Sequence, residues 1–498
     1  MGPHTWRRTR ILQQPHTQHL ERQRHCKQWF VKLCIKCYRT ELPCLYDEVD
    51  VSNTVNGKPI YYWFKRENDT IPLNAGFVAL ISCRNITVAN LTLEKNLEGI
   101  VLAYSNNCTI YGNSLIDNGD VGYGYGSIVI YQSSNNTIRN NTVATNDWTG
   151  MGILIDQGSN HNIVSENKIV KTSDGIRIPS TASHNEIFGN HLEYNTRGIG
   201  IESSASYNVI RNNYVAGSGQ NGMAVNGQYN SILENDVIAC KYGISIGGQH
   251  NVIVGNNIAE NYERGIFAGG TYNNISDNTI INNNEGVYIS SGCQNNCIYH
   301  NNFVDNMKHV TYYWSGDGNF WNSSYPTGGN YWSGYENKYP NATELDGSGL
   351  WNTPYVINAK NIDYCPLMAP TKPVTRKFIA YNSVKVEVYS NSSVSQFQFN
   401  INIKSISFNI TGPAGTKGFC DITIPLSILW GGFTLYMDDV QLEEGVNYTK
   451  TCNDVQCIFH ITYAHSKHRL EIFGTQVIRN FQAWLQRCCL LRLRVYLQ

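Results

Sequence analysis

Apolar and polar residues alternate with a period of two in a phrase that recurs between Asn85 and Phe303. Three consecutive copies read GILIDQGSNHNIVSENKIV (152–170), GIRIPSTASHNEIFGNHLE (175–193) and GIGIESSASYNVIRNNYVA (198–216). Alternation is typical of strands, and most steps between copies are 21 to 23 residues. So short a repeat leaves no room for a crossover helix, and each strand must pair in parallel with its equivalent one turn later. The pattern therefore predicts an all-β fold, a right-handed, single-stranded parallel β-helix of about ten turns.

The apolar positions of the repeat predict which side chains fill the interior. In register, they form two columns that point inward. The first column contains Ile153, Ile176, Ile199, Met223, Ile244, Ile266 and Val287, and the second contains Ile155, Ile178, Ile201, Val225 and Ile246.

An asparagine recurs once per turn, at positions 85, 107, 136, 162, 185, 208, 230, 251, 273 and 296. Asparagine tolerates the left-handed backbone conformation of a sharp corner, and stacked amides hydrogen-bond along a column. The repeated glycine is expected to supply a positive φ before the next strand. We interpret both positions as scaffold.

Changes in composition divide the chain into five segments. Residues 1–46 are basic, contain no apolar run typical of a signal peptide, and are expected to be disordered or read from a wrong frame. The β-helix is expected over 47–310, followed by an aromatic-rich cap over 311–370. After the linker APTKP (369–373), regular alternation predicts a small antiparallel β-sandwich over 371–475. The basic tail 476–498 is too short and too charged to span a membrane.

Charge and cysteine usage narrow the classes of partner and compartment. The formal net charge is zero and only 15% of residues are charged, which argues against nucleic acid or an anionic membrane as the main partner. Twelve Asn-x-Ser/Thr sequons favour an extracellular glycoprotein. The pairs Cys293/Cys297 and Cys452/Cys457 are each compatible with a disulfide or with two free thiols.

The repeat GIxI…N-x-I…N-x-I, with GGNYWSGY (328–335) and NTPYVINAKNIDYCPLM (352–368), resembles the NosD-like family over residues 46–369. These are right-handed β-helix proteins related to the carbohydrate-binding and sugar-hydrolase group, and the sandwich looks like a module found in archaeal surface proteins. The resemblance implies export to the cell surface. The family's eponymous role, periplasmic copper delivery to nitrous oxide reductase, implies copper as a possible ligand. The acidic stretch from Asp346 offers only weak support for calcium.

Outward positions of the strand that begins each repeat carry the candidate catalytic residues. Asp156 and Glu202 lie two turns apart, about 9.6 Å at 4.8 Å per turn. That is the wide edge of the separation used by inverting glycosidases, about 6.5–9.5 Å. Arg177 lies on the turn between them, and Asp174 opens the same strand.

Two turns are longer than the rest, with steps of 29 and 26 residues before Asn136 and Asn162. Their inserts, 117–126 and 145–150, are expected to form a lip beside the candidate catalytic residues. Aromatic rings and carboxylates suit stacking on sugars and hydrogen bonding to their hydroxyls. The expected ligand-binding residues are Asp117, Asp120, Tyr123, Tyr125, Tyr131, Asp147, Trp148 and Arg197.

His161 and His184 occupy adjacent turns in the column that precedes the repeated asparagine, where a metal could in principle be shared. Copper(I) prefers thiolate and thioether ligands, so a stacked surface ladder is the favoured interpretation of this column. For the whole chain we expect an exported, cell-surface β-helix glycoprotein that binds carbohydrate or acts in structure or adhesion. The alternatives are a polysaccharide hydrolase, lyase or epimerase, and a copper-delivery accessory protein.

Overall fold

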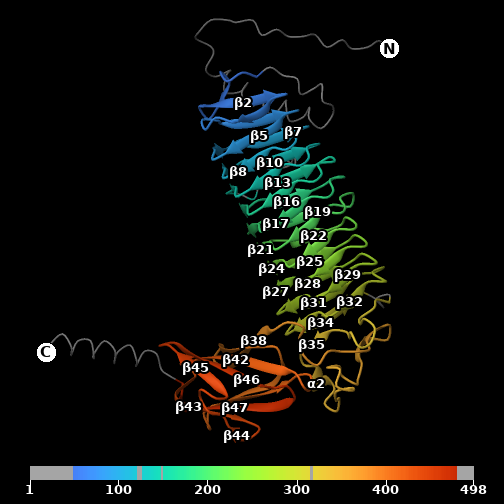
Figure 1. Cartoon of the computed structure of the whole chain (residues 1–498), viewed down its shortest axis with the longest axis vertical. Coiled ribbons are helices and arrows are strands. Elements are labelled where there is room, and N and C mark those ends of the chain that lie inside the picture. Colours follow the sequence, from blue (N-terminus) through green and yellow to red (C-terminus); the bar gives the residue numbers. More distant parts are fainter. Residues whose placement is uncertain (1–48, 120–125, 147, 149, 314–317, 479–498) are drawn as a thin grey trace, which may run out of the picture.

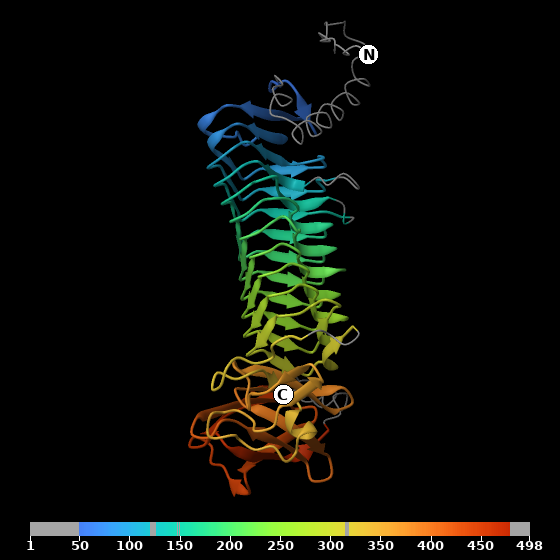
Figure 2. The same ribbon diagram turned by 90° about the vertical axis from the view of Figure 1, so that its right-hand side faces the viewer.

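The computed structural model describes residues 49–119, 126–146, 148, 150–313 and 318–478. A long solenoid of stacked strands runs from the N-terminal end of this part of the chain to a compact domain at its C-terminal end (Figure 1). Viewed at a right angle, equivalent strands of successive turns lie above one another in columns (Figure 2). The parallel β-helix and the antiparallel C-terminal sheets confirm the predicted fold class.

Three sheets run along the solenoid. The first, which we call the long sheet, has 13 strands: β1 (Thr54–Val55), β2 (Lys58–Phe64), β4 (Phe77–Ile81), β7 (Ile100–Ala103), β10 (Gly126–Tyr131), β13 (Met151–Asp156), β16 (Asp174–Ile178), β19 (Arg197–Ile201), β22 (Asn221–Val225), β25 (Tyr242–Ile246), β28 (Arg264–Ala268), β31 (Glu285–Ile289) and β34 (Lys308–Tyr312).

The second sheet has 11 strands: β3 (Glu67–Thr70), β5 (Arg84–Ala89), β8 (Thr109–Tyr111), β11 (Thr137–Arg139), β14 (Ile163–Ser165), β17 (Glu186–Phe188), β20 (Val209–Arg211), β23 (Ser231–Leu233), β26 (Val252–Val254), β29 (Asn274–Ser276) and β32 (Cys297–Tyr299). The third sheet also has 11: β6 (Thr92–Glu94), β9 (Ser114–Ile116), β12 (Thr142–Ala144), β15 (Lys168–Val170), β18 (His191–Glu193), β21 (Tyr214–Ala216), β24 (Asp236–Ile238), β27 (Asn257–Ala259), β30 (Thr279–Ile281), β33 (Asn302–Val304) and β35 (Tyr331–Trp332).

The core lies inside the coil and consists of the predicted columns. Ile153, Ile176 and Ile199 pair in register on consecutive turns, and every residue of the two predicted columns is at most 1% exposed. Because strict alternation places every second residue of a strand inside, the two inward columns follow from the sequence period alone.

The asparagine ladder is present, but the backbone reason predicted for it is wrong. The buried ladder begins at Asn136, whose amide donates to Asn162 Oδ1, 3.1 Å away, and it continues to Asn319. The residue before each ladder position takes the positive φ instead, as His161 and Tyr207 do. Asn85 and Asn107 belong to that preceding column. The ladder asparagine is therefore selected by amide hydrogen bonding rather than by left-handed backbone.

The repeated glycine also has a different reason from the one predicted. At Gly175 no positive φ occurs, yet a Cβ would lie 2.5 Å from Leu192 Cδ2 and 2.6 Å from the Gly198 carbonyl oxygen. The glycine is required because consecutive turns approach one another too closely for a side chain.

The aromatic segment after the solenoid closes the exposed end of the asparagine ladders. It contains α2 (Tyr335–Lys338), β36 (Tyr355–Asn358) and β37 (Asn361–Asp363). Asn361 Oδ1 accepts from Asn319 N and Trp321 Nε1, and Asp363 Oδ2 accepts from Asn330 N and Trp332 Nε1, both at 2.8 Å. Burial raises the pKa of Asp363 to about 6, against the opposing effect of these donors.

Two five-stranded antiparallel sheets form the C-terminal domain. One contains β38 (Val374–Tyr381), β39 (Val384–Ser390), β42 (Lys417–Pro425), β46 (Gln456–Ala464) and β45 (Tyr448–Cys452). The other contains β40 (Ser393–Asn400), β41 (Ser405–Thr411), β47 (Lys467–Val477), β43 (Leu429–Met437) and β44 (Val440–Gln441). Apolar side chains of both sheets enclose a separate core.

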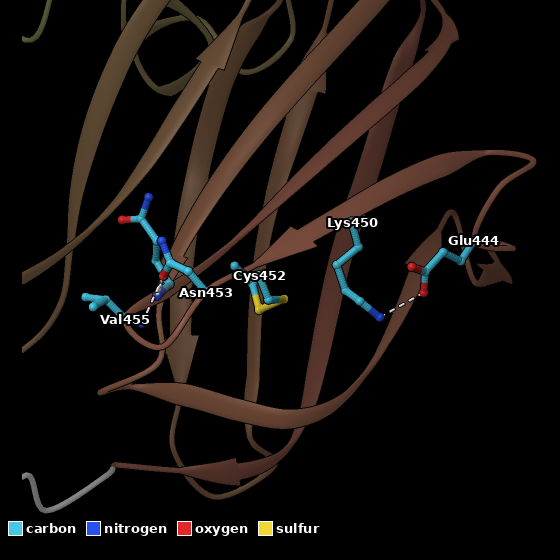
Figure 3. The surroundings of a disulfide bond; sticks show 7 residues. Glu444, Lys450, Cys452, Asn453 and Val455 are labelled. Atoms are coloured by element: carbon cyan, nitrogen blue, oxygen red, sulfur yellow. Dashed lines mark hydrogen bonds and ion pairs between the residues drawn. A yellow bond between two sulfur atoms is a disulfide. The ribbon is translucent and has the colours of Figure 1, made fainter. Parts of the chain in front are cut away.

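The predicted cysteine pairs have different outcomes. Cys452 and Cys457 form a disulfide that closes the β45–β46 hairpin, beside the Lys450–Glu444 ion pair of 2.8 Å (Figure 3). Cys293 and Cys297 remain free thiols. Within the described residues, no helix is long and apolar enough to cross a membrane.

Candidate functional site

Four of the predicted residues meet on the outer face of the long sheet. Asp174 and Arg197 are aligned at the first positions of β16 and β19. Arg177 lies further along β16, and Glu202 directly follows β19. Because equivalent positions of consecutive turns are about 4.8 Å apart, residues that are remote in sequence become neighbours here. We call these four residues the charged cluster.

Two arginines and two carboxylates of the charged cluster are connected to one another. Arg197 Nε donates to Asp174 Oδ1, and Arg197 Nη1 lies 3.1 Å from Glu202 Oε1. Arg177 lies 3.5 Å from Asp174 Oδ2 and 3.4 Å from Glu202 Oε1. Each arginine thus bridges both carboxylates, and this arrangement preorganises the four side chains across two turns.

The backbone on which the charged cluster lies is shaped to hold it. A Cβ at Gly200 would lie 3.0 Å from Arg197 Nε, so the absent side chain leaves space for the guanidinium to lie flat against the strand. Burial lowers the pKa of Arg197, but the hydrogen bond that Arg197 donates to Asp174 and the charges of both carboxylates outweigh it and raise the pKa overall.

The cluster is accessible in part. Side chains of Arg177 and Glu202 are 29% and 25% exposed, whereas Asp174 is 8% exposed. Glu202 Oε2 also accepts from Asn226 Nδ2 at 3.3 Å, on the following turn. A ligand therefore meets donors from Arg177 and Asn226 and acceptor oxygens from Glu202, a set suited to hydroxyl groups.

Asp156 lies outside this network, although the sequence grouped it with Glu202. Its Oδ1 accepts from Ser180 Oγ at 2.6 Å and from Gln157 N at 2.9 Å. Asp156 itself is buried, with 5% exposure. The pairing of Asp156 and Glu202 as two catalytic carboxylates stays a prediction.

The predicted lip is only partly within the described residues, because Asp120, Tyr123, Tyr125 and Asp147 lie outside them. Asp117 accepts from both the backbone and side chain of Asn146, which anchors the following turn. Trp148 is half exposed, and its indole donates to the Tyr194 carbonyl oxygen at 2.7 Å. Tyr131, expected to face a ligand, is instead buried at 3% exposure and packs against Tyr104.

The column of His161 and His184 is a ladder of six stacked rings. His161, His184, Tyr207, Tyr229, His250 and Tyr272 follow one another at centroid distances of 5.0 to 5.4 Å. The rings of His161 and His184 are 24° from parallel, so the nitrogen lone pairs, which lie in the ring planes, lie in two nearly parallel planes. A shared metal needs both nitrogens within about 2.1 Å, and this stacking does not direct them to one point.

The described residues do not fit a copper centre. They contain no group of three or more His, Cys, Asp or Glu side chains able to hold a metal ion. Most free cysteines among them are buried, and burial raises the pKa of Cys108 to about 11 and of Cys293 to about 12. A protonated thiol is a poor ligand. Calcium also finds no such group, and Asp346 instead accepts from Tyr325 OH at 2.5 Å.

Three residues that were not assigned to the site from the sequence contact predicted site residues. Asn226 contacts Glu202, Ser180 contacts Asp156, and Tyr194 supports Trp148. Asn226 was readable from the alignment of outward columns, one turn beyond Glu202. The other two contacts depend on corner geometry that the repeat pattern does not specify.

Comparison with known proteins matches the chain to a protein family. A family model described as periplasmic copper-binding protein (NosD) matches residues 45–231 and 204–337, which together are more than half of the chain. No curated protein matches the chain.

Solved structures with similarity to the chain are parallel β-helix proteins. The Dettilon tailspike protein is 13% identical, with a TM-score of 0.40 over 78% of this chain and 88% of the tailspike. A GH87 α-1,3-glucanase catalytic domain is 11% identical, with a TM-score of 0.37 over 55% of this chain and 60% of that domain. An alginate lyase from Paenibacillus sp. is 16% identical, with a TM-score of 0.34 over 50% of this chain and 91% of the lyase.

Proposed function

The chain belongs to the NosD family, and from this premise we propose that it is an extracytoplasmic protein that binds glycans at the charged cluster. The observation that carries the proposal is the double bridge of Arg177 and Arg197 to Asp174 and Glu202 on the outer face of the long sheet. Such a fixed set of donors and acceptors on a rigid sheet pays little ordering entropy when a ligand binds.

Two further features support a sugar as the ligand. The cluster combines donors and acceptors in nearly equal number, and sugar hydroxyls act as both donor and acceptor. Trp148 and Tyr194 are exposed by 49% and 57%, and Tyr194 lies three residues before Arg197 on the same turn. Exposed aromatic rings stack on the apolar faces of sugars.

Binding is favoured over catalysis by the way the carboxylates are held. Asp174 and Glu202 contact the same two arginines, so both carboxylates have the same kind of partner. A glycosidase needs two carboxyl groups in different environments, one of them protonated. We therefore propose a carbohydrate-binding module, with a structural or adhesive role at the cell surface.

Glycan-array binding followed by titration calorimetry tests this proposal. Replacing Arg177→Ala should weaken binding at least tenfold, because the substitution removes guanidinium donors and one of the two bridges between the carboxylates. A matched control is Arg211→Ala, which breaks an Arg–Glu pair of 2.7 Å between adjacent turns of the second sheet and should leave affinity unchanged. Equal affinities for the Arg177 variant and wild type, or no glycan bound by wild type, contradict the proposal.

Product assays on the same glycans separate binding from catalysis. Wild type should release neither reducing ends nor unsaturated products. If products do form, Asp156→Asn and Glu202→Gln identify whether the carboxylates are responsible, and the binding-only proposal is then wrong.

Location is tested separately. The family description names a periplasmic protein, and this supports a location outside the cytoplasm. Fractionation of the native host should recover the protein with the cell envelope or the medium. Recovery with cytoplasmic markers would exclude the proposed location.

A further inference from the structure

The Asn-x-Ser/Thr sequons of the chain fall into two groups in the structure. Six of the twelve asparagines have a positive φ, from 53° to 58°, and all six are exposed. We call them the corner sequons: Asn68, Asn85, Asn90, Asn107, Asn135 and Asn140. Asparagine adopts this left-handed conformation readily, and at a convex corner of the solenoid its side chain reaches solvent. The other six asparagines have no positive φ.

The corner sequons flank the first four strands of the second sheet, β3, β5, β8 and β11. One column lies where these strands begin and consists of Asn68, Asn85, Asn107 and Asn135. Asn90 and Asn140 lie in a second column, directly after β5 and β11. Among the described residues, no sequon asparagine belongs to a strand of the long sheet. The corner sequons and the charged cluster therefore belong to different sheets of the solenoid.

Both halves of each corner sequon are accessible. Asn85 Nδ2 donates to Asn68 Oδ1 at 2.7 Å, between two exposed side chains. The side chains of the other four corner asparagines make no hydrogen bond within the described residues. All six corner sequons end in threonine, and none of these threonines is buried. The motif is an acceptor for glycosylation where it is on the surface of an exported protein, and the corner sequons meet the surface condition.

Three sequons of the other group are closed by burial. They begin at Asn274, Asn391 and Asn409, and we call them the closed sequons. Their hydroxyl residues are between 2% and 6% exposed: Ser276, Ser393 and Thr411. Asn409 and the corner residue Asn85 begin the same tripeptide, Asn-Ile-Thr. Only the structure distinguishes these two positions, because their local sequences are identical.

We propose that the corner sequons are sites of N-linked glycosylation, on both sides of the second sheet. The donor is an oligosaccharide joined through phosphate to a polyprenyl carrier. Asparagine Nδ2 forms a bond to the anomeric carbon of the sugar and gives up one proton to a base of the transferase. The bond from that carbon to the phosphate oxygen breaks, and the carrier phosphate leaves with the electron pair. The inference rests on the location outside the cytoplasm proposed above, where such acceptors are modified.

The repeat of the solenoid limits how many corner sequons are occupied at once. Consecutive members of the first column are one turn, about 4.8 Å, apart, and a sugar ring with its substituents is wider than this spacing. We therefore expect glycans on alternate turns of that column in any one molecule. Asn90 and Asn140 are two turns, about 9.6 Å, apart, with Gly112 on the turn between them. Both can carry a glycan in the same molecule.

Glycans at these positions cover the first strands of the second sheet. An attached oligosaccharide is bulky and strongly hydrated, so it keeps other macromolecules from this side of the solenoid. The outer face of the long sheet has no sequon asparagine on its strands. The charged cluster therefore remains open to a ligand while the neighbouring side is shielded.

Glycopeptide mass spectrometry of the full-length protein from its native host tests the proposal. Peptides with corner sequons should carry glycans and those with closed sequons should not, so Asn85 is modified and Asn409 is bare. Equal occupancy of the two groups overturns the proposal. Unmodified protein recovered from the cell envelope or the medium overturns it as well and leaves the proposed location intact. Recovery from the cytoplasm refutes the location and this proposal together.

A pair of substitutions at Thr142 tests one site in the same assay. Thr142 is the exposed first residue of β12 and the hydroxyl residue of the sequon at Asn140. Thr142→Ala leaves Asn140 in place but removes the hydroxyl, and should lower glycan occupancy at Asn140 at least tenfold. Thr142→Ser keeps the hydroxyl and should keep the glycan, and circular dichroism checks that both variants fold. Unchanged occupancy in the alanine variant, or loss in both variants, contradicts the assignment.

Discussion

At the scale of single residues, the solenoid depends on small groups that link one turn to the next. Asn185 Oδ1 accepts from the backbone and side chain of Asn162, and its own amide donates to Ser159 O and Asn208 Oδ1. Buried amides of this kind satisfy corner groups that no strand pairs. The ladder asparagine therefore makes the hydrogen bonds to buried backbone groups that water would otherwise make.

Replacing a ladder asparagine should be costly. Asn185→Ala leaves the Asn162 N–H and the Ser159 carbonyl buried without partners, at about 1–3 kcal/mol for each group. We expect the free energy of unfolding to fall by about 3 kcal/mol or more, measured by urea denaturation. Asn284→Ala, at an exposed position, should change it by less than about 0.5 kcal/mol. Similar losses for both variants would show that the ladder does not stabilise the fold.

A second residue-scale prediction separates the two reasons for glycine. Gly175→Ala forces a Cβ against the Gly198 carbonyl oxygen at 2.6 Å and should destabilise the protein by about 1–3 kcal/mol. At Gly219 nothing lies within 4 Å of the added carbon and φ is not positive. Gly219→Ala should therefore be neutral or slightly stabilising. Differential scanning calorimetry of the two variants checks the contrast.

At the scale of elements, the cap ends the ladders by supplying acceptors that no further turn provides. Trp332 stacks between Phe303 and Tyr355, at 4.3 and 4.2 Å, and its indole donates to Asp363. The cap thus places one ionisable group in a buried position at the end of the solenoid. The stability of this element should depend on pH through that group.

The direction follows from the raised pKa of Asp363. Its folded pKa of about 6 exceeds the ordinary value of 3.8 for an aspartate, so its stabilising contribution is full below pH 3.8 and is lost as pH rises through 6. Compared with Asp363→Asn, wild type should lose about 2–3 kcal/mol between pH 4 and pH 7.5. Urea denaturation of both proteins at the two pH values measures the difference.

The comparison with the variant is necessary because other groups act in the opposite direction. Burial lowers the pKa of His309 and His465. Both histidines therefore reduce the free energy of unfolding as pH falls below 6.5. These histidines are present in both proteins, and their effect cancels in the difference. If the difference in free energy of unfolding between wild type and Asp363→Asn does not change with pH, ionisation of Asp363 does not destabilise the folded protein.

At the scale of the whole molecule, an ion pair between a buried arginine and a half-buried aspartate joins the C-terminal domain to the solenoid. Arg376 of β38 binds both carboxylate oxygens of Asp305, which follows β33. Around it, Tyr331 OH donates to Ser393 Oγ at 3.2 Å, and Thr371 N donates to Asn302 Oδ1 at 2.9 Å. The two domains therefore share one continuous packed interface.

Breaking one partner of this pair should loosen the interface. Arg376→Met leaves the half-buried Asp305 carboxylate without its partner, at a cost of about 1–3 kcal/mol. We expect faster proteolysis within the linker 369–373 and a larger radius of gyration in solution scattering. The double variant Asp305→Asn/Arg376→Met should recover much of the loss. No recovery would show that packing, rather than charge, fixes the domains.

The repeat alone determined the fold of the solenoid and the identity of its core. An alternation with a period of two and a repeat of 21 to 23 residues fit only a parallel β-helix. In such a repeat each turn can bury its apolar residues only against the turns before and after it. The same register brought Asp174, Arg177, Arg197 and Glu202 to one face, so outward columns were also readable.

Only the tertiary structure decided which of those outward residues meet. Side-chain direction separated Asp156, held by Ser180, from Glu202, held by two arginines. The tertiary structure also changed the physical reason for the repeated glycine and asparagine. The close approach of neighbouring turns and the hydrogen bonds between them cannot be read from a one-dimensional pattern. The burial of Tyr131 likewise depends on what covers the outer face of the sheet, and strand alternation carries no information about that.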